Sequence, residues 1–392
     1  MRFLLVKALA ELHCYSQFAN SLQRALVEIG HEAVVSDQSG QIAGRVADVR
    51  LFALELQRGR YDAVVSFSSF FGNVALEDGG PSLYDALDVT FVGWQLDHPI
   101  YAPASLTRKL QRRLGVYANR SHQAFADAIR LPGRAAVMLP GGEPLPVPLT
   151  DYKARRLPIF IAATCNGRPQ APWTSLPDTP AKRLLVGVID RLLADPEVSL
   201  LAAFNGASTD LGLGAQLGKN PAFDDQMIAF LRDPLTYVRQ KDRVDIITDV
   251  ADAGLPLALC GPGWKELIGD RSNVIFIEQT VDFADLPRLY NEARIVLNWN
   301  SGNGACERAL YAAFAGAAVV SDDSAQLAAA LDGGTEVTFF NRARRGAVAE
   351  ALGDLIESDR GEAVAERGFA RVSRDSRWAG RAEQLVRLLT RA

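Results

Sequence analysis

The chain has 392 residues, a formal net charge of -4, and ordinary proportions of hydrophobic (48%) and charged (22%) residues. A chain of this length is too long to fold around a single hydrophobic core of ordinary size. It therefore favours two domains, each with its own apolar interior. The charge gives no sign of general attraction to nucleic acid, so we expect no nucleic-acid partner. The N-terminal apolar run is only FLLV, too short for a signal peptide, and no run reaches the length of a transmembrane segment.

Strand and helix patterns alternate through the first half of the chain. Strands are predicted at 2–9, 31–36, 61–69, 89–96, 115–121 and 135–140. Helices are predicted at 15–29, 45–57, 105–113 and 122–129. This alternation indicates a doubly wound parallel sheet. We therefore assign residues 1–150 to an N-terminal Rossmann-like domain.

A proline-bearing stretch separates the two halves. Residues 140–158 carry five prolines and no helical or strand period, which is typical of an interdomain linker. The clearest strands of the second half are predicted at 158–164, 255–261, 273–279, 293–299 and 316–322. A helix at 285–293 lies between two of them. We assign residues 151–375 to a second Rossmann-like domain.

Two regions of the second half are mainly helical. Between residues 174 and 240, helices are predicted over 181–193 and 224–240, with the glycine-rich segment 204–218 as a loop between them. The pattern after Arg342 is helical and charged, and the last helix has apolar positions spaced for one buried face. We expect this C-terminal helix, within 376–392, to cross back and pack on the N-terminal domain.

The chain has four widely spread cysteines without a CxxC pair: Cys14, Cys165, Cys260 and Cys306. Their spacing argues against a zinc site and against a disulfide framework. Free cysteine is among the most buried residue types, so we expect small core side chains. This cysteine usage fits a reducing compartment and predicts a cytoplasmic location.

The stretch 298–324 joins a buried strand, a glycine-bearing turn, a small-residue helix and another strand. The helix is predicted to start near Gly304, which would point its exposed N–H groups and positive dipole end at the turn. Gly302 and Gly304 would let a ligand approach the backbone without a Cβ in the way. Arg308 would oppose the helix dipole by roughly 0.3–1 kcal/mol, which a nearby anion explains, although it could instead pair with a surface carboxylate. The turn therefore predicts a phosphate site.

Four motifs of the second half carry a family resemblance. They are CGPGW at 260–264, DLPRLYNEARIVLN at 285–298, ERALYAAFAGA at 307–317 and SRWAGR at 376–381. Together they resemble the spore-maturation-type (CgeB-like) group of GT-B glycosyltransferases, related to the large retaining GT-B family. The N-terminal half matches only in overall pattern.

The resemblance implies an α/β GT-B fold, two doubly wound Rossmann-like domains facing a cleft. It implies transfer of a sugar from a nucleoside diphosphate sugar, with retention, to an acceptor that could be a glycan, a lipid, a protein or a small molecule. The first domain would hold the acceptor and the second the donor. Helix N-termini and basic side chains would stabilise the leaving diphosphate, and no DxD stretch stands at a strand end, so we expect no metal and no cofactor. The oligomeric state stays open.

Residues beside the strand ends of the second domain are the donor-site candidates. Arg168, Lys265 and Arg308 would bind the diphosphate. Trp264 would lie against the donor or simply pack, and polar residues at a strand end would bind ligand or cap the turn. The full predicted set is Asn166, Arg168, Gly261, Gly263, Trp264, Lys265, Asn298, Asn300, Ser301, Gly302, Asn303, Gly304, Glu307, Arg308 and Tyr311.

The chain departs from the family pattern at two positions. Retaining relatives usually carry two glutamates eight residues apart, and those positions are Asn303 and Tyr311 here. Asparagine can still form hydrogen bonds, whereas tyrosine does not replace a carboxylate that grips two hydroxyls. Glu307, one turn earlier, could take over this role or could simply be an acidic residue at a helix start.

The segment GWQLDHP is the strongest signal of the first domain, because a strand runs directly into Asp97 and His98. Relatives often place a histidine here, so His98 is predicted beside the donor sugar, with Asp97 orienting it or acting as a base. A turn-capping Asp97 with a solvated His98 is the alternative. His13 and Tyr15 follow the first strand and are predicted to line the acceptor site.

Other functions remain possible on the same fold. A sugar-nucleotide epimerase would convert the donor without an acceptor. A catalytically degenerate nucleotide-sugar-binding protein would bind the donor without turnover, which Asn303 and Tyr311 leave open. A nicotinamide-dependent enzyme is disfavoured, because KALAELHCYS after the first strand lacks the glycines that a pyrophosphate needs there.

Overall fold

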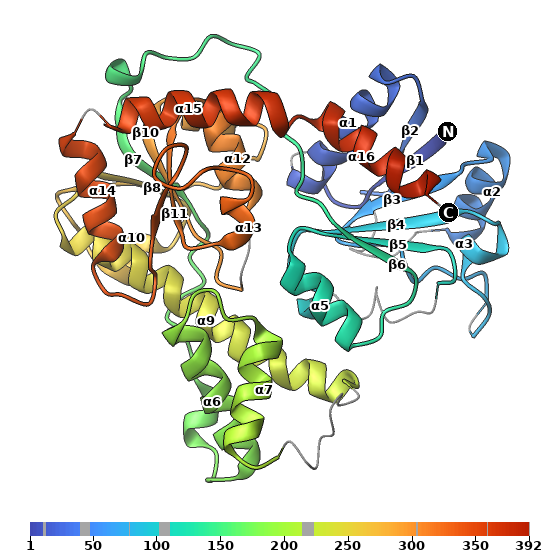
Figure 1. The fold of residues 1–392 in the computed structure, drawn as a ribbon, viewed down its shortest axis with the longest axis horizontal. Coiled ribbons are helices and arrows are strands. Elements are labelled where there is room, and N and C mark those ends of the chain that lie inside the picture. Colours follow the sequence, from blue (N-terminus) through green and yellow to red (C-terminus); the bar gives the residue numbers. More distant parts are fainter. Residues whose placement is uncertain are drawn as a thin grey trace. The chain divides into compact units, whose positions relative to one another are not determined.

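The computed structural model describes residues 1–10, 13–39, 48–77, 79–101, 110–213, 223–302, 305–358 and 360–391. The chain forms two compact units (Figure 1). Unit 1 comprises Met1–Gly141 and Ser376–Ala392, and unit 2 comprises Gly142–Asp375. Each unit contains a six-stranded sheet with helices around it, and the recorded strand pairs are parallel.

The sheet of unit 1 has the strand order β2-β1-β3-β4-β5-β6. Its strands are β1 (Arg2–Lys7), β2 (Glu32–Asp37), β3 (Ala63–Phe67), β4 (Thr90–Gln95), β5 (Arg113–Tyr117) and β6 (Arg134–Val137). Its helices are α1 (Cys14–Glu28), α2 (Val49–Gly59), α3 (Leu83–Ala86), the 3-10 turn η1 (Pro99–Tyr101) and α5 (Arg120–Ala128). The six predicted strands are confirmed. The helix predicted over 105–113 lies mostly outside the described residues, and its last residue, Arg113, opens β5 instead.

The C-terminal helix α16 (Trp378–Thr390) belongs to unit 1 and packs against α1. Trp378 is only 1% exposed. Its ring centroid lies 5.5 Å from Phe18, 6.1 Å from Phe67 and 5.9 Å from Trp94. Buried aromatic surface of this size stabilises a core strongly, so α16 closes the interior of unit 1.

The sheet of unit 2 has the strand order β12-β11-β10-β7-β8-β9. Its strands are β7 (Leu157–Ala162), β8 (Leu257–Cys260), β9 (Val274–Ile277), β10 (Ala293–Asn298), β11 (Ala318–Asp322) and β12 (Thr338–Phe340). Its helices are η2 (Tyr152–Ala154), η3 (Pro172–Ser175), α6 (Pro180–Ala194), α7 (Leu200–Asp210), α9 (Asp225–Asp252), α10 (Trp264–Ile268), α11 (Leu286–Asn291), α12 (Glu307–Phe314), α13 (Ala325–Ala328), α14 (Ala347–Glu357) and α15 (Arg360–Asp375). The five predicted strands are confirmed, whereas β12 was not predicted.

A helical insertion lies between β7 and β8, and we define it as α6, α7 and the first half of α9. Figure 1 shows it extending away from the sheet of unit 2. The second half of α9 returns to the core, where Ile246, Ile247 and Val250 are buried. The insertion therefore joins the sheet through a continuous helix.

The predicted loop at 204–218 is wrong in its first part, because residues 200–210 form α7. Ser199 caps this helix by accepting the N–H of Ala202 at 3.1 Å. A Cβ on Gly206 would come within 2.7 Å of the Arg191 side chain on α6. This glycine therefore serves close helix packing and not a turn; residues 214–222 lie outside the described part of the chain.

None of the described helices combines the length and the apolar character that a membrane span requires.

Candidate functional site

A short turn after β10, Trp299–Gly302, forms the centre of the candidate site in unit 2; we call it the β10 turn. Asn298, fully buried at the strand end, donates its side-chain N–H to the Ser321 hydroxyl at 2.9 Å. Its Oδ1 accepts from Nη1 of Arg308 at 3.4 Å. Gly302 has a φ of +123°, which only glycine adopts without strain. The Asn298 side chain therefore has partners within the protein, and it helps to hold the Arg308 guanidinium beside the turn.

Helix α12 begins at Glu307, later than the predicted start near Gly304. Asn303 and Gly304 lie outside the described residues. Cys306 is the N-cap and its side chain does not cap the helix. Its thiol lies 3.3 Å from the carboxylate of Glu307, and burial together with that carboxylate raises the pKa of Cys306 to about 12. Glu307 therefore accepts a hydrogen bond from a protonated thiol.

Tyr311, at one of the positions where relatives carry glutamate, packs its ring on Phe283 with the centroids 5.0 Å apart. The ring-to-ring geometry is edge-on, as aromatic pairs prefer. The tyrosine thus extends an apolar contact where a carboxylate is usual.

An arginine cluster, Arg239, Arg243 and Arg308, adjoins the β10 turn. Arg308 stacks on Trp299, 5.7 Å from the ring centroid, and Arg243 donates to the carbonyl of Thr164, just past β7, at 2.8 Å. Burial, together with the charges of Arg308 and Arg239, lowers the pKa of Arg243 to about 10. No acceptor among the described residues pairs with the buried Nε of Arg243. Glu307 and Asp322 are among the neighbours that raise the pKa of Arg308, so Arg243 is the member whose ionised form its surroundings disfavour.

Sequence reasoning missed Arg239 and Arg243. They stand one turn apart on α9, and this spacing puts both on one face of the helix. Arginines on a long polar helix are usually exposed to solvent, so the spacing alone did not indicate a binding role for these two.

The other predicted donor residues are placed at the ends of β7 and β8. Asn166 and Arg168 are exposed after β7. Gly261 is needed where it stands, because a Cβ there would lie 2.2 Å from the carbonyl oxygen of Ala163. Gly263, with a φ of +84°, starts α10.

Trp264 and Lys265, the remaining two candidates near β8, have partners within the protein. Trp264 is 0% exposed and donates its indole N–H to the carbonyl of Ala163 at 2.8 Å, so it packs in the core and is not available to a donor. Lys265 is exposed and its ammonium lies 2.9 Å from Asp270. That pair is a surface salt bridge, which weakens the case for Lys265 as a phosphate ligand.

In unit 1, Tyr15 and Asp97 meet at the carboxyl edge of the sheet. The Tyr15 hydroxyl donates to Oδ2 of Asp97 at 2.7 Å, and the Asp97 side chain is exposed. Burial, and then Asp97, raises the pKa of Tyr15 well above its usual value, so the phenol stays protonated. His13 caps α1, accepting the N–H of Tyr15 at 3.2 Å, and its ring packs edge-on against Tyr15 with the centroids 4.8 Å apart. The structure thus brings three of the four predicted residues together.

His98 turns into unit 1. It is 4% exposed, its Nδ1 accepts the N–H of Ile100 at 3.2 Å, and its ring contacts His122 and Phe125 with centroid distances of 4.9 and 4.6 Å. The alternative of a solvated His98 is therefore wrong. His122, predicted near a helix start, is the third residue of α5.

Replacing His98 by alanine is expected to lower the free energy of unfolding by about 1–3 kcal/mol, because it empties a packed site and removes the hydrogen bond from the Ile100 N–H to Nδ1. His98→Asn keeps an acceptor in place of Nδ1 and should lose less. Urea denaturation of both variants measures the difference. Equal stability of wild type and His98→Ala would contradict the packing role.

A strained turn follows β3 at the same edge of the sheet. Ser68, Ser69 and Phe71 have φ values of +55°, +55° and +65°, unusual for residues other than glycine. Gln95 donates to the Ser69 hydroxyl at 2.6 Å, and a Cβ on Gly93 would come within 2.2 Å of that hydroxyl. Backbone held in this way against its preference is concentrated at functional sites. The turn follows β3, which lies between β1, the strand before the α1 residue Tyr15, and β4, the strand that ends just before Asp97. Sequence reasoning missed this turn.

Within the described ranges, no group of three or more His, Cys, Asp or Glu side chains is placed to hold a metal ion.

One protein-family model matches the C-terminal part of the chain. Residues 239–387 match the model of a family described as Glycosyl transferase-like, and this stretch is less than half of the chain. It contains Arg239, Arg243, the β10 turn and α12. No curated protein sequence is significantly similar to the chain.

Solved structures match over nearly the whole chain. Sucrose-phosphate synthase from Thermosynechococcus elongatus is 11% identical, with a TM-score of 0.56 and 99% of this chain and 98% of that chain covered. HepE from Anabaena, in complex with UDP and glucose, is 12% identical, with a TM-score of 0.57 and both chains fully covered. The chain has the GT-B fold. This fold, with its two Rossmann-like sheets, is the predicted one, and together with the family match it supports a glycosyltransferase.

A third GT-B structure is an alpha-glucosyltransferase in complex with UDP and a 13-mer DNA. It is 10% identical, with a TM-score of 0.55 and both chains fully covered. The UDP in this complex and in that of HepE belongs to those proteins. At such low identity the likeness to this GT-B chain is one of fold.

Proposed function

We propose that this GT-B protein is a metal-independent, retaining glycosyltransferase that uses a nucleoside diphosphate sugar as donor. The arginine cluster beside the β10 turn carries the proposal, because Arg243 and Arg308 are like charges held close together and partly desolvated. A diphosphate would supply negative charge to Arg243, whose buried Nε has no acceptor among the described residues. The first turn of α12, which has no side-chain cap, would add backbone N–H groups.

Unit 1 would bind the acceptor through the Tyr15–Asp97 pair. As the bond between the sugar C1 and the diphosphate oxygen breaks, the electron pair leaves on the diphosphate and the acceptor oxygen bonds to C1. The exposed carboxylate of Asp97 would accept the proton of the acceptor hydroxyl, and Tyr15 would orient that carboxylate. His98 would support this loop from within and not touch the sugar.

The closer kinship with the spore-maturation-type group is part of this proposal and depends on the four sequence motifs. The free cysteines are in keeping with a cytoplasmic location. UDP is the first nucleotide to test, because the HepE and alpha-glucosyltransferase structures contain it.

Thermal shift against UDP, GDP, ADP, CDP and dTDP tests the donor site. At a concentration of about a hundred times its dissociation constant, a bound nucleotide adds roughly 2.7 kcal/mol of stability, which raises the melting temperature measurably. Proton NMR of the product would give its anomeric configuration. No binding, and no release of nucleoside diphosphate from any of a panel of nucleotide sugars, would refute the proposal.

Two outcomes would favour the alternatives. Conversion of a nucleotide sugar to its epimer without acceptor would indicate an epimerase. Tight binding with no turnover would indicate a nucleotide-sugar-binding protein, in keeping with the apolar packing of Tyr311 on Phe283.

A further inference from the structure

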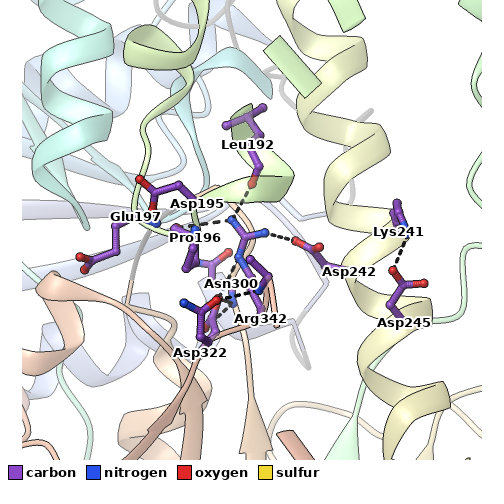
Figure 2. Close-up of polar contacts among 12 residues, drawn as sticks. Leu192, Asp195, Pro196, Glu197, Lys241, Asp242, Asp245, Asn300, Asp322 and Arg342 are labelled. Atoms are coloured by element: carbon purple, nitrogen blue, oxygen red, sulfur yellow. Dashed lines mark hydrogen bonds and ion pairs between the residues drawn. The ribbon is translucent and has the colours of Figure 1, made fainter. Parts of the chain in front are cut away.

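Arg342 joins four segments of unit 2 through one buried guanidinium, as Figure 2 shows. Its Nη1 donates to Oδ2 of Asp242 on α9 at 2.5 Å, and its Nε lies 3.6 Å from Oδ2 of Asp322 at the end of β11. Its Nη2 donates to the carbonyl of Leu192 on α6 at 3.3 Å and to the carbonyl of Pro196, in the loop after α6, at 3.4 Å. The side chain is only 1% exposed, so these contacts are shielded from water.

Asp322 in turn holds the β10 turn. Both carboxylate oxygens accept the backbone N–H of Asn300, at 3.1 and 3.3 Å (Figure 2). The Ser321 hydroxyl, which also accepts from Asn298, lies 3.4 Å from Oδ1 of Asp322. A continuous line of polar contacts therefore runs from the helical insertion, through Arg342 and Asp322, to the turn beside the arginine cluster.

Two buried carboxylates, Asp242 and Asp322, share the guanidinium of Arg342, and the charge of Arg308 also acts on Asp322. Burial outweighs the opposing charge of Arg342 at both carboxyl groups: it raises the pKa of Asp322 to about 7 and also raises the pKa of Asp242. Lys241 and Asp245 are the other charged groups that act on Asp242. An ionised Asp322 binds the Asn300 N–H more strongly than a protonated one does.

We propose that Arg342 and Asp322 are positioning residues that fix the β10 turn for donor binding and link it to the helical insertion. The inference rests on the proposed function, since that function gives the turn its ligand. Neither side chain needs to touch the donor, because both act through the backbone of Asn300.

Asp322→Asn is the main test, since asparagine has the same size and still accepts a hydrogen bond but carries no charge. Amide hydrogen exchange at Asn300, measured without nucleotide, is expected to become about 5–10-fold faster, the difference between a charged and a neutral acceptor. The dissociation constant for UDP should rise by a similar factor.

The pH dependence separates positioning from a general structural role. In the wild type, UDP binding should weaken as the pH falls through about 7, because Asp322 becomes protonated there. Asp322→Asn should lack this change. The titration of the nucleotide itself is common to both proteins, so the difference between the two profiles reports Asp322.

Arg342→Lys is the second variant, because one ammonium group does not maintain contacts with Asp242, Asp322 and two carbonyls together. It should also accelerate exchange at Asn300. Asp323→Asn, one residue beyond Asp322 and outside these contacts, is the matched control and should behave as wild type. If Arg342→Lys does not fold, Asp322→Asn decides alone.

Unchanged exchange at Asn300, together with an unchanged UDP affinity and pH profile in Asp322→Asn, would overturn the proposal. The two proposals fail separately. If the wild type binds no nucleotide, the proposed function fails, while the exchange rate at Asn300 still decides whether Asp322 holds the turn.

Discussion

Replacing Asp97 by asparagine is expected to lower kcat for glycosyl transfer by about 10²–10⁴-fold, the usual contribution of a general base. The amide still accepts the hydrogen bond that the Tyr15 hydroxyl donates at 2.7 Å, so the local structure should persist. It does not take up the acceptor proton. The substitution leaves the side chains of the arginine cluster unchanged, so the dissociation constant for UDP should stay unchanged. Initial rates with the preferred donor and acceptor, and calorimetry with UDP, measure the two effects.

Tyr15→Phe is the matched control for Asp97→Asn. It removes the hydrogen bond to the carboxylate but leaves the carboxylate in place, so kcat should fall by only about tenfold, the value of one such bond. A larger loss in Tyr15→Phe than in Asp97→Asn would assign the proton transfer to the phenol. Full activity of Asp97→Asn would remove the residue from the mechanism.

The central strands of both sheets could be predicted from the sequence because they are buried on both faces. Such strands appear as nearly continuous apolar runs, as in β3 and β11, where every residue is buried. Strand β12 has three residues, only one of them fully buried, which is too little pattern to detect.

The glycines of the helical insertion misled the prediction for a different reason. Locally, Gly206 is followed by residues that favour turns, so the segment reads as a loop. In the structure, the absence of a side chain at Gly206 lets α6 and α7 pack closely. Gly187 on α6 has the same role: a Cβ added there would lie 3.1 Å from the Cβ of Ala207 on α7. Packing between distant segments outweighs local preference here, and a single sequence does not reveal it.

The candidate site could be predicted only where it lies on strand ends. Asp97, Tyr15 and Arg308 follow strands, and the carboxyl ends of parallel strands meet at one edge of a sheet. Arg342 and Asp242 are 100 positions apart and join only because α9 runs from the helical insertion to the core. His98 was predicted beside the sugar from its position, but the direction of its side chain depends on the packing of α5, which the local sequence does not specify.

Replacing Arg243 by glutamine is expected to raise the dissociation constant for UDP by about 10–150-fold, as for the loss of hydrogen bonds to a charged group. The reason is the arrangement of the arginine cluster: Arg243 has a buried Nε with no acceptor among the described residues, and it feels the charges of Arg308 and Arg239. A bound diphosphate would satisfy the donor and compensate the charges. Calorimetric titration with UDP measures the affinity of each variant.

The same substitution should leave the unliganded protein nearly as stable as the wild type. Glutamine gives up the bond to the Thr164 carbonyl, worth about 1 kcal/mol, but it also removes the repulsion from Arg308 and Arg239. Urea denaturation without and with UDP should therefore show a large loss of nucleotide-induced stabilisation and a small change without nucleotide.

Arg288→Gln is the matched control, because Arg288 is an exposed arginine of the same unit that lies 3.8 Å from Asp285. It should change neither the affinity nor the stability by more than about 0.5 kcal/mol, as expected for an exposed ion pair. If Arg243→Gln bound UDP as tightly as wild type, or if it unfolded the protein while Arg288→Gln did not, the cluster would be structural. The position of Arg243 would then need another explanation, because burial and the charges of Arg308 and Arg239 all disfavour its ionised form.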